Sequence, residues 1–138
     1  MGKQHKKVVV PPCSGIGKVY GALARETMYE LLERVRPDMV VTTCLPLLVI
    51  KDPEAVALVT GNPVITIDGC PKDCAKKSVE ALGKAVDKAF EAIKFYKEHK
   101  DLKPEGIAEV NDTGRKLAQV AAAEVAQEVD KLAAGEEQ

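Results

Sequence analysis

Short, β-branched runs alternate with helical patterns along this chain, and the alternation limits the folds open to it. The runs are residues 7–10, 38–43 and 64–67, and each is rich in Val, Ile or Thr. Nearly continuous apolar runs of this length are typical of strands buried on both faces, as in a parallel sheet covered by helices. The sequence therefore predicts strands at these three places and an α/β fold.

Helical patterns separate these strands. Apolar side chains recur at helical spacing over residues 20–35, and the pattern ends before Pro37, because the residue preceding a proline avoids the helical conformation. Asp52 followed by Pro53 predicts a helix start, since Asp caps the first N–H groups and Pro suits the first helical position. Gly61 ends that short helix.

The second half of the chain predicts further helices and one weaker strand. A helix opens at Pro71, and the glycine at 83 leaves open whether residues 75–99 form one helix or two. The apolar face of this stretch carries Val79, Leu82, Val86, Phe90 and Ile93. Residues 107–110 predict a fourth strand, and residues 111–113 offer capping side chains for a last helix. The stripe of that helix is Leu117, Ala121, Val125, Val129 and Leu132.

The order of these elements predicts a single three-layer α/β domain over residues 1–138. Strands separated by helices are parallel, so we expect a small, mostly parallel sheet of about four strands with helices on both faces. The chain has 138 residues, of which 46% are hydrophobic, and this is enough to bury one core. We expect residues 1–6 and about 134–138 to be flexible.

The composition excludes several classes of partner. A net charge of −1 and an aromatic content of 4% give neither the positive field nor the stacking surface that nucleic-acid binding needs. No apolar run reaches the roughly 18 residues of a membrane span, and the run after the basic N-terminus is too short for a secretory signal. We therefore expect a cytoplasmic protein with reduced thiols and with no nucleic-acid or membrane partner. A protein partner stays possible.

The four cysteines carry the strongest functional signal, because each lies just past a predicted strand or in a first helical turn. Cys13, Cys44 and Cys70 follow the first, second and third strands, and Cys74 lies one helical turn after Cys70. The carboxyl ends of parallel strands meet at one edge, and ligand sites form where the strand order reverses. If the first strand lies between the second and third, these thiols converge at that edge.

Four converging thiolates suit tetrahedral Zn²⁺, with Zn–S distances of about 2.3 Å, and equally suit an iron–sulfur cluster. Helix N-termini and Lys18 offset part of the net charge of about −2 of a four-thiolate zinc centre. Such a site leaves no open coordination position, so we do not expect hydrolytic zinc chemistry. The leading hypothesis is a zinc-binding protein, and an iron–sulfur or dithiol redox protein is the alternative.

Two other interpretations of the cysteines stay open. Four separate buried thiols would be small apolar side chains that need no metal. Alternatively, Cys13 is a nucleophile activated at a helix N-terminus, although the sequence offers no general base, because His5 and His99 both lie in charged segments. The glycine-rich segment 15–18 does not complete a phosphate-binding loop, because Val19 replaces the required Ser or Thr.

The segment IDGCPKDCA at residues 67–75, together with the CSG at 13–15 after the first strand, resembles the DGC-domain family. The resemblance extends over about residues 7–75, and the DTG at 112–114 is similar to a D-L-G segment of that family. Members are small cytosolic proteins described as zinc-binding because of four characteristic cysteines. The resemblance therefore implies that the metal ligands are the four cysteines Cys13, Cys44, Cys70 and Cys74. It names a site and not a pathway.

Overall fold

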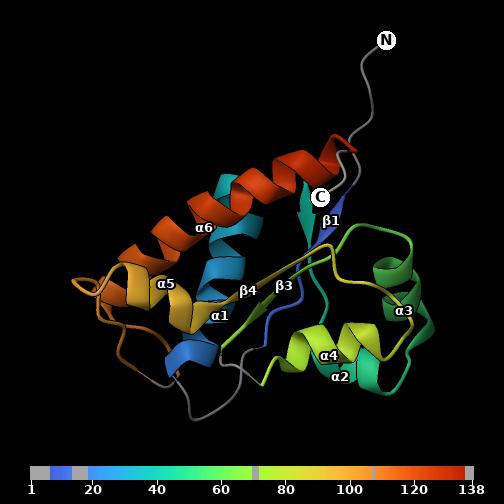
Figure 1. The fold of residues 1–138 in the computed structure, drawn as a ribbon, viewed down its shortest axis with the longest axis horizontal. Helices are drawn as coiled ribbons and strands as arrows, with labels where there is room; N and C mark the ends of the chain where they lie inside the picture. The colour runs from blue at the N-terminus through green and yellow to red at the C-terminus, as the bar shows by residue number, and fades with distance from the viewer. Residues whose placement is uncertain (1–6, 14–18, 70–71, 107, 136–138) are drawn as a thin grey trace.

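The computed structural model describes residues 7–13, 19–69, 72–106 and 108–135. Strands and helices alternate through most of the chain, which confirms the predicted α/β class (Figure 1). The elements are β1 (Val8–Val9), α1 (Val19–Glu30), the π-helical turn η1 (Leu31–Val35), β2 (Val40–Val41), α2 (Leu45–Val49), α3 (Pro53–Thr60), β3 (Ile65–Asp68), α4 (Cys74–Glu80), β4 (Lys88–Glu91), α5 (Ala92–Glu98) and α6 (Asp112–Ala133). No helix of these described ranges is long and apolar enough to cross a membrane.

The strands are parallel, and β1 occupies the position that the sequence analysis requires. β1 pairs with β2, and β3 pairs with β4, in both cases parallel. Two parallel bridges, Val9 to Val64 and Pro12 to Ile67, join β1 to β3. The spatial order is therefore β2-β1-β3-β4, with the reversal of strand order between β1 and β3.

Helices cover both faces of these strands and create two separate hydrophobic cores. The larger core includes Val8 of β1 and Val10, which follows this strand, and packs them against α1, α5 and α6. The smaller core lies on the opposite face and contains Val9, Leu48, Ala55, Val59, Val64 and Val79. Figure 1 shows α1, α5 and α6 on one side of the strands and α2, α3 and α4 on the other. The two cores give the three-layer arrangement.

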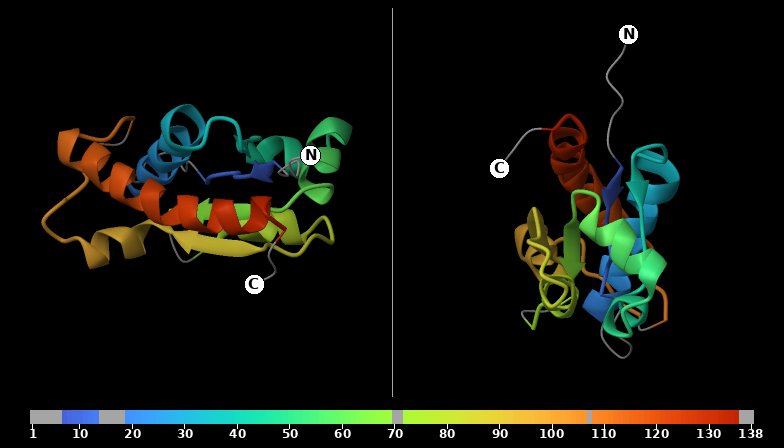
Figure 2. Two further views of the ribbon diagram at one scale, coloured as in Figure 1. Left: turned by 90° about the horizontal axis from the view of Figure 1, so that it is seen from above. Right: turned by 90° about the vertical axis from the view of Figure 1, so that its right-hand side faces the viewer.

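The predicted helix caps are confirmed where their side chains are described. The Asp52 carboxylate accepts the N–H of Ala55 at 3.1 Å and so begins α3. The Asn111 side chain accepts the N–H of Gly114 at 2.8 Å and begins α6. Helix α6 is the long helix that crosses the molecule in both Figure 1 and the left view of Figure 2. All five apolar residues of its predicted stripe are buried.

The prediction of one or two helices over residues 75–99 is wrong, because β4 lies between α4 and α5. The apparent helical stripe joins two opposite faces, since Val86 packs on the smaller core and Phe90 on the larger one. Asp87 aligns this strand with β3: its carboxylate accepts the N–H of Val64 at 2.8 Å, and its own N–H donates to the Val64 carbonyl at 3.0 Å. Long-range pairing thus overrides a local helical pattern.

Three smaller expectations also change. The fourth strand expected at 107–110 is absent, because residues 108–110 form bends and coil; residue 107 lies outside the described residues. The helix that the sequence analysis expected to open at Pro71 is α4, which begins at Cys74. Helix α2 is one that the sequence analysis did not identify. Several residues that the sequence analysis singled out lie outside the described residues. They are His5, the glycine-rich segment with Lys18, Cys70, Pro71 and most of the termini expected to be flexible.

Candidate metal centre

Cys13 lies at the carboxyl ends of two strands at once. Its backbone N–H donates to the Ile67 carbonyl at 2.9 Å, which continues the parallel pairing of β1 with β3 beyond Pro12. Proline has no N–H, so the register here depends on the bonds on either side of it. The side chain of Cys13 is half-buried. This thiol therefore lies at the reversal point of the strand order, where the sequence analysis expects it.

Cys44 follows the neighbouring strand. The hydroxyl of Thr42 donates to the Val10 carbonyl at 2.8 Å and holds the end of β2 against β1. Cys44 is then the N-cap of α2, with an extended backbone, and its side chain is exposed. Pro46 lies in the first turn of this helix, a position that tolerates its missing N–H.

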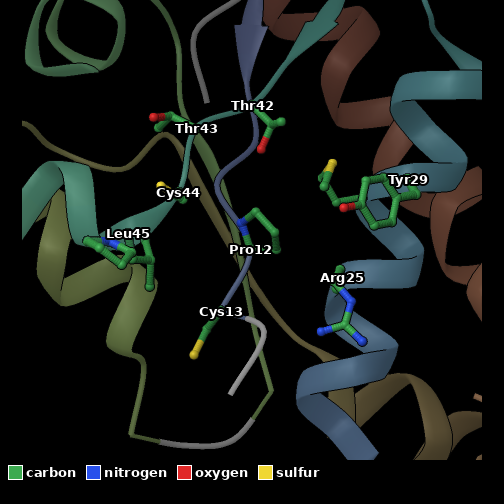
Figure 3. Close-up of a pocket in the computed structure, with 10 residues that line it drawn as sticks. Pro12, Cys13, Arg25, Tyr29, Thr42, Thr43, Cys44 and Leu45 are labelled. Carbon is green, nitrogen blue, oxygen red and sulfur yellow. The ribbon is translucent and has the colours of Figure 1, made fainter. Parts of the chain in front are cut away.

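Cys13 and Cys44 line the same pocket, which has a volume of about 480 Å³. In Figure 3 the two sulfur atoms lie on the side of the pocket nearer α2, whereas Arg25 and Tyr29 reach it from α1 on the other side. The lining residues are Pro12, Cys13, Arg25, Met28, Tyr29, Thr42, Thr43, Cys44, Leu45 and Pro46. The structure thus brings together two of the four predicted ligands, from different strands.

Cys74 is positioned by a buried carboxylate. Asp68, at the end of β3, accepts the N–H of Ala75 at 2.6 Å and the N–H of Lys76 at 3.1 Å. These bonds hold the first turn of α4, which begins with Cys74, against the carboxyl end of β3. The side chain of Cys74 is exposed and does not line the pocket of Cys13 and Cys44.

The environment of Asp68 shifts its pKa. The side chain is 1% exposed, and this burial raises the pKa above the ordinary carboxyl value. The two backbone N–H donors act in the opposite direction, and the nearby charges of Asp73 and Glu91 add to the increase. The net direction is upward. Asp68 is therefore a structural carboxylate that joins a strand to a helix at the candidate site.

The structure explains why glycine occupies position 69 in the DGC segment. A Cβ atom at this position would lie 2.8 Å from the backbone nitrogen of Gly21 and 3.0 Å from the carbonyl carbon of Tyr20. Both atoms belong to the backbone of α1, which cannot move aside easily. The chain thus needs glycine here so that it can pass close to α1 on its way to Cys70.

The four predicted ligands differ in what the structure says of them. Cys13 and Cys44 share a pocket, Cys74 begins α4 at the end of β3, and Cys70 lies outside the described residues. Within the described ranges, no three His, Cys, Asp or Glu side chains are grouped so that they could hold a metal ion. The donors that are described are thiols, and thiolates are the donors that zinc and iron–sulfur clusters prefer. The donor chemistry therefore fits, and a complete set needs Cys70.

Sequence reasoning missed the other polar residues of the pocket, Arg25, Tyr29, Thr42 and Thr43. Arg25 and Tyr29 are four residues apart and share one face of α1. Their spacing was visible in the sequence, but it has no functional meaning until α1 is known to lie beside the ends of β1 and β2.

Comparisons with known proteins give one result. A family model described as the DGC domain matches residues 9–114. No curated protein and no solved structure is significantly similar to the chain. The match contains all four cysteines and extends beyond the segment in which the sequence motif is recognisable.

Proposed function

The chain belongs to the DGC-domain family, and from this premise we propose that it is a zinc-binding protein whose ligands are Cys13, Cys44, Cys70 and Cys74. The observation that carries the proposal is the shared pocket of Cys13 and Cys44, which come from separate strands. The N–H of Cys13 also donates to the carbonyl of Ile67, which precedes Cys70 by three residues in the sequence. The backbone of Cys13 is therefore hydrogen-bonded to the strand that leads to the third predicted ligand.

The charges around the pocket support thiolates there. Among the described residues that line the pocket, Arg25 is the one formally charged side chain, and none is a carboxylate. A nearby positive charge favours the deprotonated form of a thiol, which is the form that binds metal. A centre of four thiolates and one Zn²⁺ has a net charge of about −2, and this guanidinium offsets part of it.

The proposed role is metal binding and not hydrolysis. Four thiolates close the coordination shell, so no position is left for a water molecule or a substrate. The zinc then either stabilises the ends of the three strands or is transferred to a partner protein. Either role requires reduced thiols, and the proposal therefore places the protein in the cytoplasm.

Elemental analysis after anaerobic purification tests the metal. We expect close to one zinc per chain, little iron and no visible absorption. Iron together with sulfide and a visible absorption band would replace zinc with an iron–sulfur cluster, because the same four thiolates serve both. A preparation with neither metal that also fails to take up added Zn²⁺ would overturn the proposal.

Single serine substitutions test the ligands. Cys13→Ser, Cys44→Ser, Cys70→Ser and Cys74→Ser are each expected to lose most of the bound zinc. Ser78→Ala is the matched control, since Ser78 lies one turn after Cys74 on α4 and its hydroxyl donates to the Cys74 carbonyl. It should keep the zinc content of the unmodified protein. A variant such as Cys74→Ser that binds zinc fully would remove that residue from the ligand set and contradict the four-ligand assignment.

A further inference from the structure

The α1 side of the pocket carries an arginine that is fixed in place. Nη2 of Arg25 donates to the carbonyl of Ala108 at 2.5 Å, across to the loop that precedes α6. A guanidinium has five N–H donors in a rigid planar fork, so this bond occupies one donor and restricts the orientation of the others. In Figure 3 Arg25 lies on the opposite side of the Pro12–Cys13 backbone from Cys44.

Arg25 differs from the other arginines in having no carboxylate partner among the residues that the structure describes. The chain has four arginines, and three pair with acids: Arg34 with Glu30, Arg36 with Asp130 and Arg115 with Asp112 and Glu109. Within the described part of the chain, no carboxylate forms an ion pair with Arg25 or lines its pocket. The positive charge of Arg25 thus lies in a pocket that offers it no carboxylate from the described residues.

The remaining walls favour an organic ligand. Pro12, Met28, Leu45 and Pro46 are apolar, and the ring of Tyr29 adds to this surface. A volume of about 480 Å³ lies within the range of small-molecule sites, roughly 300 to 1,000 Å³. Such sites combine apolar walls with a few polar groups that fix the ligand's orientation, and Arg25 is suited to that role.

We propose that this pocket binds a small monocarboxylate with an apolar body, and that Arg25 holds the carboxylate. A planar carboxylate matches the guanidinium fork with two parallel hydrogen bonds. Its single negative charge balances the single positive charge, whereas a phosphate of about −1.5 to −2 would leave excess negative charge beside Cys13 and Cys44. The inference goes beyond zinc binding and does not depend on it.

Titration of the ¹⁵N-labelled, full-length protein with hexanoate tests the proposal. We expect saturable shifts of the side-chain Nε–H signal of Arg25 and of the backbone N–H of Tyr29. Hexanamide has nearly the same shape without the charge, so it should bind at least about tenfold more weakly, as expected for loss of a charge-assisted hydrogen bond. Equal affinity for hexanoate and hexanamide, or no saturable binding of hexanoate, would overturn the proposal.

Two matched variants separate the pocket from general surface charge. Arg25→Gln should weaken hexanoate binding at least about tenfold. Arg34→Gln makes the same change of charge on an exposed side chain that pairs with Glu30, and it should leave the affinity unchanged. Should Arg25→Gln fail to fold, the comparison of hexanoate with hexanamide on the unmodified protein still decides. Full binding of hexanoate by a folded Arg25→Gln variant would contradict the proposal.

Zinc content is measured in the same samples. It should be equal in the unmodified protein and Arg34→Gln, whereas Arg25→Gln removes the charge that favours the thiolates and should bind zinc more weakly. Protein that contains no zinc but binds hexanoate through Arg25 would contradict the metal proposal alone. Protein that contains zinc but does not distinguish hexanoate from hexanamide would contradict the carboxylate proposal alone.

Discussion

The backbone N–H of Cys13 donates to the carbonyl of Ile67 at 2.9 Å, and this bond joins the ends of the first and third strands. It fixes the backbone of one proposed metal ligand relative to the segment that leads to Cys70 and Cys74. Because the bond is between backbone atoms, it does not depend on the state of any thiol. The strand ends are therefore expected to keep their arrangement when no metal is bound.

Removal of the metal should accordingly leave the helices and strands intact. Both hydrophobic cores consist of residues other than cysteine, so the fold has a source of stability besides the metal. Crowded thiolates repel one another without the metal, and part of them must take up protons, which lowers stability. We expect an unchanged far-ultraviolet circular dichroism spectrum after chelation and a lower melting temperature. Complete loss of helical signal, or an unchanged melting temperature, would contradict this view.

Replacement of Asp68 should destabilise the protein and change its response to pH. Asp68→Ala leaves the N–H groups of Ala75 and Lys76 without their acceptor, which costs about 1–3 kcal/mol of unfolding free energy. Urea unfolding measures this loss. Asp101→Ala, at an exposed carboxylate, is the control and should change stability by no more than about 0.5 kcal/mol.

The pH dependence follows from the direction of the shift. Burial raises the pKa of Asp68 above 3.8, so the folded protein binds this proton more tightly than the unfolded chain does. The stability contributed by Asp68 is thus greatest at or below the ordinary carboxyl pKa and declines as pH rises through the raised value. The free-energy difference between the unmodified protein and Asp68→Ala should shrink over that range. A difference that grows with pH would show that the two N–H donors outweigh burial.

An added methyl group at Gly69 should affect both the fold and the metal site. Gly69→Ala places its Cβ against the backbone of α1, and overpacking of this kind costs about 1–3 kcal/mol. It also displaces the chain next to Cys70, so we expect lower zinc content. Gly83→Ala is the comparison: its φ of 81° makes alanine unfavourable, but nothing lies within 4 Å of the new Cβ. That variant should lose stability and keep its zinc.

One surface ion pair connects the end of η1 to α6. Arg36 binds Asp130 with both arms of the guanidinium, with Nε to Oδ1 and Nη2 to Oδ2 distances of 2.8 Å each. Both side chains are partly exposed, so Asp130→Ala should cost only about 0.5–1 kcal/mol, and less at high salt. Glu105→Ala removes the looser, exposed pair with Lys103, whose atoms are 3.9 Å apart, and should have no measurable effect on thermal unfolding. Equal losses from the two substitutions would contradict this ranking.

The first three strands were predictable because each is a short apolar run that ends at a recognisable residue. Asp52 and Asn111 likewise act locally, since a side chain and the N–H three residues later suffice to begin a helix. By contrast, β4 exposes Lys88 and Ala89, and its bonds go to a distant strand. Nothing in its own sequence outweighs the helical spacing around it.

The candidate site likewise has a part that could be predicted from the sequence and a part that could not. The shared pocket of Cys13 and Cys44 follows from parallel strands, which the order of elements predicted, with β1 between β2 and β3, which the sequence analysis took only as a condition. The participation of Arg25 does not follow, because it depends on how α1 lies across the strand ends and on a contact with Ala108. Such contacts arise from packing and have no signature in local sequence.

The alternation of three consecutive valines between the two cores has a consequence for local unfolding. Val9 belongs to the smaller core with α2, α3 and α4, whereas Val8 and Val10 belong to the larger one. Local stability follows the amount of buried apolar contact, so we expect faster amide hydrogen exchange in the smaller half. The helices around the smaller core carry Cys44 and Cys74, whereas Cys13 lies on the segment that follows β1. Transient opening would therefore separate the thiols from one another, and a bound metal that joins them would slow exchange throughout α2 and α4.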